Sequence, residues 1–415
     1  MTFNFTLLSM GSTSLIALKF IDEQQKEFTI KTSLKINPGK WNTDKQRPEN
    51  IYLKIFKKLN AKLDSIKIGV SNYLKEVASK QRKFSLNVLT RLIKKCCILS
   101  EKLFAEGSLL EATHNFIQSR LHLISGNTHR RYNVFFSMLR RFEGFQQKHL
   151  MINEVNSNFV KDFIKFGELE AYSSSTIYRT IYFVRTILNF LEKRGIRTFV
   201  YELELPKVKK HNRVISLTED ELIRIKETEV PSQLKAAKDW LVISCYTGQR
   251  VSDFMNFNLD MMEILDGKPC LSFTQQKTQK TILLPLHPTA IHIMSDNGNN
   301  FPSKLSAQKY NEQIKEIARL AGINSLIKVR TRTGFRSTEK LIQKWEAITS
   351  HIGRRSFASN FYGKIPTPLL MQATGHSTEL MFQRYISNTD TERTRSLGAY
   401  LDEVYKSKFL VKKKC

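Results

Sequence analysis

The chain has 415 residues, and at roughly 150 residues per domain this length predicts two or three domains. Hydrophobic residues make up 41% and charged residues 25%, a balance that excludes an intrinsically disordered chain. Lysine and arginine number 66 against 38 acidic residues, so the formal net charge is +28. Such a basic surface favours nucleic acid as the partner over an anionic membrane, and over an ordinary basic protein with no such partner.

Cysteine usage and hydropathy indicate the cellular compartment. The five cysteines, at positions 96, 97, 245, 270 and 415, form no CxxC pair and have no metal-ligand spacing. An odd number with one adjacent pair argues against a disulfide framework and fits a reducing cytoplasm. No apolar run reaches the roughly 18 residues of a membrane span, and the first residues lack the basic start of a signal peptide. We expect a cytoplasmic protein with no membrane association.

The first 50 residues predict a small β module. Alternation in TSLIALKFID and KEFTIKTSLKI predicts two strands joined around DEQQ, followed by a turn at NPGKWN. Lys19, Lys31 and Lys35 fall on outward-facing positions of this sheet. We expect Lys19 and Lys31 to contact DNA, although a hairpin without a binding role would show the same pattern.

A long basic amphipathic helix is predicted within residues 51–99. Residues 51–100 contain 12 basic and 2 acidic side chains. The apolar residues recur at alternating spacings of four and three: Tyr52, Phe56, Leu59, Leu63, Ile66, Val70, Tyr73 and Val77. This heptad pattern fits a helix packed on a neighbouring element at least as well as it fits a coiled coil.

Residues 100–205 predict an all-helical domain. THRRYNVFFSMLRRFEGFQQK and SSTIYRTIYFVRTILNFLEKRG both have apolar residues at helical spacing, with a serine cluster before the second and Gly195 at its end. Their other faces carry Arg130, Arg131, Arg140, Arg141, Arg179 and Arg185. Each alone fits a solvated surface, but as a group they favour contact with DNA phosphates. The candidates for DNA binding are Arg130, Arg131, Arg179 and Arg185.

The stretch LELPKVKKHNRVISLTEDEL, residues 203–222, predicts a basic linker that ends where a helix starts at Thr218. We place the main boundary near residue 210. The expected domains are a β module at 1–50, a linker helix at 51–99, a helical domain at 100–205, the largest domain at 212–405 and a basic tail at 406–415. The predicted fold class is mainly α, with a small N-terminal β module and a β-hairpin or small sheet in the largest domain.

Four motifs in the largest domain carry candidate chemistry. In order, they are SCYTGQRVSDF, the predicted hairpin LSFTQQKTQKTILLPL, SHIGRRSFASN and ATGHSTELMFQRY. Their candidate site residues are Arg250, Lys277, His351, Arg354, His376 and Tyr385. No carboxylate cluster for Mg²⁺, no GxxxxGK[ST] loop and no GxSxG elbow accompanies them. We therefore expect neither a metal nor a cofactor.

These residue types fit metal-free attack on a phosphodiester. Two guanidiniums can clamp the non-bridging oxygens and stabilise the charge of the pentacoordinate transition state. A tyrosine hydroxyl, with an ordinary pKa of about 10, needs a base or nearby cations to act as a nucleophile. A histidine can accept its proton, and a lysine can donate one to the leaving 5′ oxygen. Each residue alone has a plainer explanation as a turn, surface or core residue; the ordered combination favours this chemistry.

The ordered motifs resemble the signature of the tyrosine recombinase, or phage integrase, family, especially integrases of Bacteroides-type integrative and conjugative elements. TGQR, a Lys-Thr pair, HIGR, TGH and a tyrosine nine residues later match that signature in turn. The resemblance implies that Arg250 and Arg354 clamp the scissile phosphate. Asp253 stands where many relatives carry glutamate, and either carboxylate can orient Arg250.

The resemblance also implies the remaining roles. Lys277 would be the general acid toward the 5′ oxygen, His351 an acid or base, and His376 a phosphate contact. Tyr385 would form a 3′-phosphotyrosine bond that preserves the energy of the broken DNA bond, so no ATP would be needed. Tyr400 and Tyr405 lack the spacing from the TGH motif and fit a C-terminal helix instead.

Further segments match the same family. The N-terminal sheet resembles its arm-type DNA-binding module, and the helical region its SAM-like core-binding bundle. The insertion VRTRTGFRSTEKLIQKWEAITSH recurs in these integrases and is expected to form an exposed hairpin with Arg330, Arg332 and Arg336. The implied partners are double-stranded attachment or recombination sites, a homotetramer on synapsed sites, and a host architectural protein or excision factor.

Three other functions compete with a site-specific recombinase. A type IB-like topoisomerase uses the same cut-and-reseal chemistry without pairing two sites. A DNA-binding regulator or accessory factor would need no tyrosine and lysine directed at one phosphate. A metallohydrolase built on His351 and His376 is disfavoured because no matching carboxylate or third ligand is visible.

Overall fold

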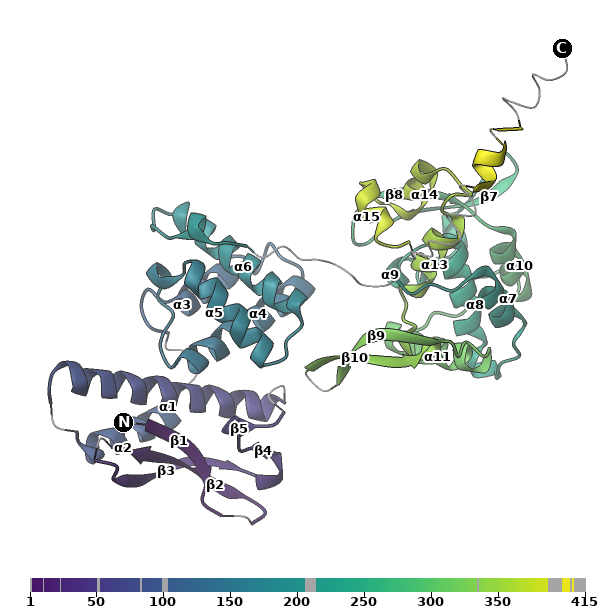
Figure 1. Ribbon diagram of the computed structural model, residues 1–415. Helices are drawn as coiled ribbons and strands as arrows, with labels where there is room; N and C mark the ends of the chain where they lie inside the picture. Colours follow the sequence, from purple (N-terminus) through teal and green to yellow (C-terminus); the bar gives the residue numbers. More distant parts are fainter. Residues whose placement is uncertain are drawn as a thin grey trace. The chain divides into compact units, whose positions relative to one another are not determined.

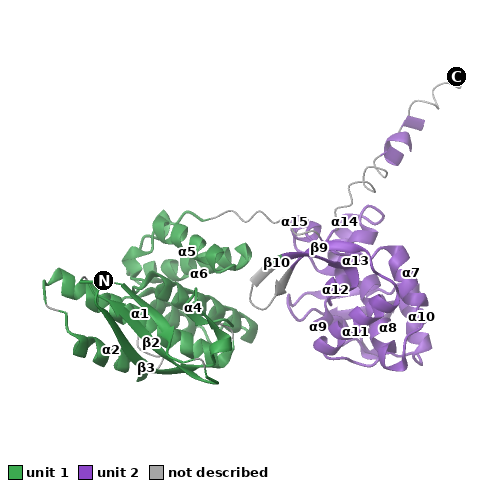
Figure 2. Ribbon diagram, turned by 60° about the horizontal axis from the view of Figure 1, so that its bottom comes forward, with its two compact units in different colours: residues 1–209, 331–338 green, residues 210–330, 339–415 purple. Residues whose placement is uncertain are grey.

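The computed structural model describes residues 2–9, 11–22, 24–50, 53–82, 84–98, 104–205, 214–333, 336–386, 398–403 and 405–406. It is mainly helical with small antiparallel sheets, which confirms the predicted fold class (Figure 1). The chain divides into two compact units (Figure 2). The first is Met1–Lys209 with Thr331–Thr338, and the second is Lys210–Arg330 with Glu339–Cys415.

The first unit begins with a three-stranded antiparallel sheet in the order β1-β2-β3. Its strands are β1 (Thr2–Leu7), β2 (Ser14–Ile21) and β3 (Glu27–Ile36), and a two-stranded ribbon of β4 (Trp41–Asn42) and β5 (Arg47–Pro48) follows. The two strands predicted from alternation are confirmed as β2 and β3. The alternation pattern did not identify β1, which pairs with β2 along its whole length.

Helices α1 (Lys54–Ser79) and α2 (Leu86–Ile98) share an apolar core with this sheet. Residues of the predicted stripe that are buried are Phe56, Leu63, Ile66, Val70 and Val77. All of these except Val77 share a core with sheet residues such as Phe20 and α2 residues such as Leu89 and Ile93. The stripe therefore packs a helix onto neighbouring elements of its own chain, while Tyr52 lies outside the described residues.

A four-helix bundle completes the first unit. Its helices are α3 (Leu109–Gln118), α4 (Gly126–Gln146), α5 (Ser157–Leu169) and α6 (Ser174–Glu192). Ser173 caps α6 as predicted, since its hydroxyl accepts from the Thr176 N–H at 3.3 Å. Gly195 follows at a φ of 78°, as a glycine past a helix end commonly does.

Arg141 corrects one sequence prediction. The sequence pattern places it among the surface arginines, but its side chain is mostly buried. Its Nη2 pairs with Glu170 at 2.8 Å, and its Nη1 donates to the Tyr172 hydroxyl. The guanidinium also lies 5.9 Å from the ring centre of Phe166. Arg141 thus joins α4 to the end of α5 and is not placed on the surface for a DNA phosphate.

The second unit is built around α8 (Ser232–Thr247), which contacts α7 (Glu219–Glu227), α10 (Pro288–Asp296), α11 (Ala307–Leu320) and α13 (Ile352–Phe361). Its other elements are α9 (Val251–Phe254), β6 (Met262–Leu265), β7 (Lys268–Thr274), β8 (Thr281–Pro285), α12 (Lys344–Ala347), α14 (Thr367–Thr374) and α15 (Glu379–Gln383). Strands β9 (Leu326–Thr333) and β10 (Arg336–Gln343) also belong to it, apart from Thr331–Thr338, which are grouped with the first unit. Thr218 and Glu221 form a capping box at the predicted start of α7.

Two predicted hairpins are present in the structure. Strands β6, β7 and β8 form an antiparallel sheet, and Lys277 lies in the turn between β7 and β8. The predicted insertion forms the β9–β10 hairpin, on which Arg330 is exposed. The side chains of Arg332 and Arg336 lie outside the described residues. Among the described helices, none combines the length and apolar character needed to cross a membrane.

Candidate active site

The end of α8 creates the first wall of the site. Gly248 ends this helix in the left-handed region, at a φ of 67°. A Cβ at this position would lie 2.6 Å from the ring of Phe357, so glycine is required by both conformation and space. The chain then turns so that Arg250 becomes the N-cap residue of α9. Asp253, one turn later, places Oδ2 3.9 Å from Arg250 Nη1 and thus orients the guanidinium.

The start of α13 supplies the second wall. His351 is its N-cap residue and Arg354 lies in its first turn. A Cβ on Gly353 would overlap Ser244 of α8, so the glycine lets the two helices approach closely. The predicted i, i+3 pair is therefore present, although its histidine sits at the helix boundary. Arg354 points inward and is fully buried, whereas His351 remains exposed.

The turns around α14 and α15 supply the third wall. Gly375 ends α14 with a φ of 71°, and His376 follows directly. Tyr385 comes two residues after α15, where its amide donates to Phe382 O at 2.9 Å and its carbonyl accepts from Ser359 Oγ at 3.4 Å. These bonds fix the backbone on both sides of the half-buried tyrosine.

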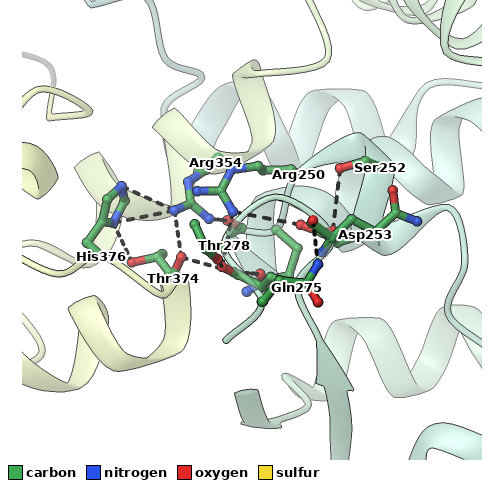
Figure 3. Close-up of polar contacts among 12 residues, drawn as sticks. Arg250, Ser252, Asp253, Gln275, Thr278, Arg354, Thr374 and His376 are labelled. Carbon is green, nitrogen blue, oxygen red and sulfur yellow. Dashed lines mark hydrogen bonds and ion pairs between the residues drawn. The ribbon is translucent and has the colours of Figure 1, made fainter. Parts of the chain in front are cut away.

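Arg354 is the centre of the polar contacts in this site (Figure 3). Its Nη1 donates to the Gly248 carbonyl at 3.0 Å and its Nη2 to the Thr374 carbonyl at 2.5 Å. The Nη2 atom also lies 3.1 Å from His376 Nε2, while Nε has no hydrogen-bond partner among the described residues. The guanidinium is therefore held by the ends of α8 and α14, and its buried Nε–H is a donor left unpaired among the described residues.

Tyr385 lies against Arg354 and His376. Its ring centre is 4.9 Å from that of His376 and 5.4 Å from Arg354 Cζ. The pKa of Arg354 is lowered to about 10, first by burial and next by the charge of Arg250, while Tyr385 opposes the shift. One fully buried guanidinium, Arg354, and one mostly buried guanidinium, Arg250, create the positive field that an attacking phenolate and a phosphate both require.

The pKa values of both histidines are lowered from the value of a free imidazole. Burial, followed by the charges of Arg354 and Arg250, lowers the pKa of His376 to about 3. Partial desolvation and the surrounding cations, led by Arg355, lower the pKa of His351 as well. A neutral imidazole can accept a proton, and His376 Nδ1 lies 2.8 Å from Thr374 Oγ1, which orients its ring.

Lys277 is exposed on the β7–β8 turn, and its charge contributes to the lowered pKa of His351. The structure thus brings all six sequence-predicted residues of the site into one region. Sequence reasoning did not assign site positions to four further residues: Gln249, Gln275, Arg355 and Thr374. All four lie inside the quoted motifs, which was their one signal. Their contacts join segments that are far apart in sequence and leave no local pattern.

The predicted DNA-binding residues lie in the first unit, away from these motifs in sequence. Arg130 and Arg131 are exposed on α4, and Arg179 and Arg185 are exposed on α6. Lys31 is exposed on β3. Lys19 forms an ion pair with Glu27 at 2.5 Å, which partly neutralises its charge. Within the described ranges, no group of three or more His, Cys, Asp or Glu side chains has an arrangement that could hold a metal ion.

Three family models match successive parts of the chain. They are an arm DNA-binding domain at residues 6–90, a phage integrase SAM-like domain at residues 108–197 and the phage integrase family at residues 215–392. No curated protein sequence matches the chain significantly. The three matches follow one another without overlap and together span both compact units.

Solved structures share the fold at low sequence identity. A lambda integrase fragment, solved as a dimer bound to a core site, is 16% identical with a TM-score of 0.50, covering 68% of this chain and 96% of that one. The Tn1549 transposon integrase with circular intermediate DNA is 13% identical with a TM-score of 0.52, covering 70% and 99%. The XerH site-specific recombinase in a post-cleavage complex is 13% identical with a TM-score of 0.54, covering 72% and 98%.

Proposed function

The chain belongs to the phage integrase family of tyrosine-type site-specific recombinases, and we propose that Tyr385 is the residue with which it cuts and rejoins DNA. The observation that carries this proposal is the convergence of Arg250, Arg354, His376 and Tyr385 from segments far apart in sequence. A protein that only binds DNA has no need for a tyrosine beside two guanidiniums that are shielded from solvent.

In the proposed step, the Tyr385 oxygen attacks phosphorus and the bond from phosphorus to the 5′ oxygen breaks. The phenol proton passes to His351, and Lys277 donates a proton to the 5′ oxygen, so the products are a 3′-phosphotyrosine and a 5′-hydroxyl. Arg250 and Arg354 hold the non-bridging oxygens as charge builds up. Attack of a 5′-hydroxyl on the phosphotyrosine reverses these events and reseals a strand.

His376 would contact the phosphate beside Arg354. Its lowered pKa keeps it neutral near pH 7, so it would act as a hydrogen-bonding group that adds no further positive charge. The role of His351 as base is supported by its position at the start of α13, in the turn that also holds Arg354.

The remaining parts of the chain would organise the DNA. We assign arm-site binding to residues 1–50, a linker helix to 51–99, core-site binding to 100–205 and catalysis to 212–405, with 406–415 a basic tail. Arg130, Arg131, Arg179 and Arg185 would meet core-site phosphates, and Lys19 and Lys31 would meet an arm site. The C-terminal helix would pack on a neighbouring protomer in a tetramer. The parent DNA would be a Bacteroides-type mobile element, and the protein would act in the cytoplasm.

Two labelled duplexes carrying the element's joined ends test this function. We expect the protein to exchange strands between them in EDTA without ATP. A type IB-like topoisomerase would relax a supercoiled plasmid and produce no recombinant joints. A regulator would retard both duplexes on a native gel and form neither product, and that result would contradict the proposed function.

A further inference from the structure

Gln275 is a fully buried glutamine whose amide makes every hydrogen bond that it can. A glutamine side chain offers two acceptor lone pairs and two donor hydrogens. Its Oε1 accepts from Arg250 Nη1 at 3.1 Å and from Thr278 Oγ1 at 2.6 Å. Its Nε2 donates to Gln249 Oε1 at 2.9 Å and to the Thr374 carbonyl at 3.2 Å (Figure 3).

These four partners come from three of the segments that hold proposed catalytic groups, those of Arg250, Lys277 and His376. Two belong to the loop after α8, one to the turn that contains Lys277, and one to the end of α14 just before His376. No other side chain described at this site bonds to all three segments. Gln275 is therefore in a position to fix these segments relative to one another.

The backbone around Gln275 reinforces this arrangement. Its amide donates to Lys280 O at 2.9 Å, and its carbonyl accepts from the Gln279 amide at 2.9 Å, so it closes the β7–β8 turn. Gly375 makes room for its side chain, because a Cβ there would lie 2.5 Å from Gln275 Oε1. Movement of the glutamine would disturb the turn and the arginine together.

We propose that Gln275 is a positioning residue that holds the Arg250 guanidinium and the Lys277 turn in one arrangement, so that the phosphate clamp and the proton donor enter the reaction together. This inference rests on the proposed function, since it takes Lys277 as the donor to the 5′ oxygen. Gln275 itself acts through Arg250 and Thr278 and makes no contact with the reacting atoms.

Replacement of the leaving oxygen by sulfur separates the two parts of this role. A 5′-thiolate leaves without a proton, so a defect in the general acid disappears on such DNA, whereas a defect in the phosphate clamp persists. The substrates are nicked duplexes with the element's end sequence and either oxygen or sulfur at the scissile 5′ position. The rate of covalent adduct formation is measured on both.

Gln275→Met keeps the length of the side chain and removes all four bonds. We expect it to slow adduct formation on oxygen DNA about 100-fold, the scale of a misplaced catalytic group. On sulfur DNA part of the lost rate should return. The defect that remains should be the part caused by misplacement of Arg250. Sulfur DNA should fully restore the rate of Lys277→Ala and should not restore the rate of Arg250→Ala. The degree of restoration for Gln275→Met should fall between these two. Gln276→Met, at the exposed neighbour, should match the unsubstituted protein on both substrates.

Thr278→Val provides a second variant that leaves the buried amide in place. It removes the hydroxyl that joins the turn to Gln275 while Arg250 keeps its bond, so we expect a loss on oxygen DNA that sulfur DNA fully restores. Unchanged rates for Gln275→Met, or no restoration for either variant, would overturn the inference. A failure of the proposed function is distinct, because the unsubstituted protein would then form no adduct on either DNA.

Discussion

At the scale of single residues, Arg354 combines a structural and a chemical task. Its guanidinium bonds to two backbone carbonyls, at Gly248 and Thr374, and lies beside His376 and Tyr385. Burial alone would penalise such a charge, and the carbonyls offset this penalty only in part, as the lowered pKa shows. A bound phosphate would offset the rest of the cost of burying the Arg354 charge. DNA binding would therefore stabilise the site.

Arg250→Ala and Arg354→Ala should each remove about 3–4 kcal/mol of transition-state stabilisation, the scale of a lost oxyanion donor. The loss is measured as the rate of adduct formation on a suicide substrate. Arg354→Ala should also lower the free energy of unfolding, because two carbonyls lose their donor. Arg319→Ala, at an exposed arginine of α11, is the control. Cleavage at the unsubstituted rate by either site variant would refute the clamp.

The neutral state of His376 makes a prediction about stability and pH. The unfolded chain binds a proton at this histidine near its ordinary pKa of about 6.5, whereas the folded chain binds it only at about pH 3. The folded state should therefore lose stability as pH falls through this window, since the unfolded state binds more protons. His376→Gln should reduce this loss in urea unfolding between pH 7 and pH 4. If the free energy of unfolding fell equally with pH in the two proteins, the burial assigned to His376 would be contradicted.

At the scale of elements, two helix ends set the geometry of the site. Gly248 and Gly375 both adopt positive φ at the ends of α8 and α14, and the carbonyls of Gly248 and Thr374 accept hydrogen bonds from Arg354. The close packing of α8 on α13 through Gly353 brings Arg354 into reach. Elements with dense packing hold catalytic groups more precisely than loops do.

Gly248→Ala tests this dependence on a helix end. The left-handed backbone should cost about 1–2 kcal/mol, and the clash with Phe357 a further 1–3 kcal/mol or so. Gly298→Ala is a matched control, because its φ is also 67° and its Cβ would enter open space. Urea unfolding measures both. Equal losses in the two variants would show that packing against Phe357 contributes nothing.

Sequence reasoning predicted the elements with local signals. Alternation gave β2 and β3, the heptad stripe gave α1, and motif spacing placed the six candidate site residues. It could not foresee that Arg141 turns inward, because its partner Glu170 is 29 residues away. The role of Gln275 was equally hidden, since its bonds reach 25 and 99 residues along the chain. Long-range polar contacts leave no periodic pattern.

At the scale of the whole molecule, the segments matched by the arm DNA-binding and SAM-like models and the proposed catalytic groups lie in different compact units. Every proposed catalytic group lies between Arg250 and Tyr385, in the second compact unit. The first unit contains the segments matched by the arm DNA-binding and SAM-like models. Basic residues occur throughout, which suits a protein that neutralises phosphates over a long stretch of duplex.

Deletion of residues 1–95 should separate arm binding from cleavage. We expect weaker binding at accessory arm sites and retained cleavage of a nicked core site, because the catalytic groups are untouched. Gel retardation measures the first and adduct formation the second, with circular dichroism to verify that the remaining helices fold. Loss of core cleavage by a folded deletion protein would mean that the N-terminal residues do more than bind arms.

The proposed mechanism requires that Tyr385 becomes covalently joined to DNA. The most direct measurement is to trap the protein on a nicked suicide duplex in EDTA, digest the adduct with protease and nuclease, and locate the modified residue by mass spectrometry. We predict a 3′-nucleotide on the peptide that contains Tyr385, and no adduct with Tyr385→Phe. A nucleotide on Tyr400, or no adduct on DNA that is demonstrably bound, would contradict the role of Tyr385 as the nucleophile.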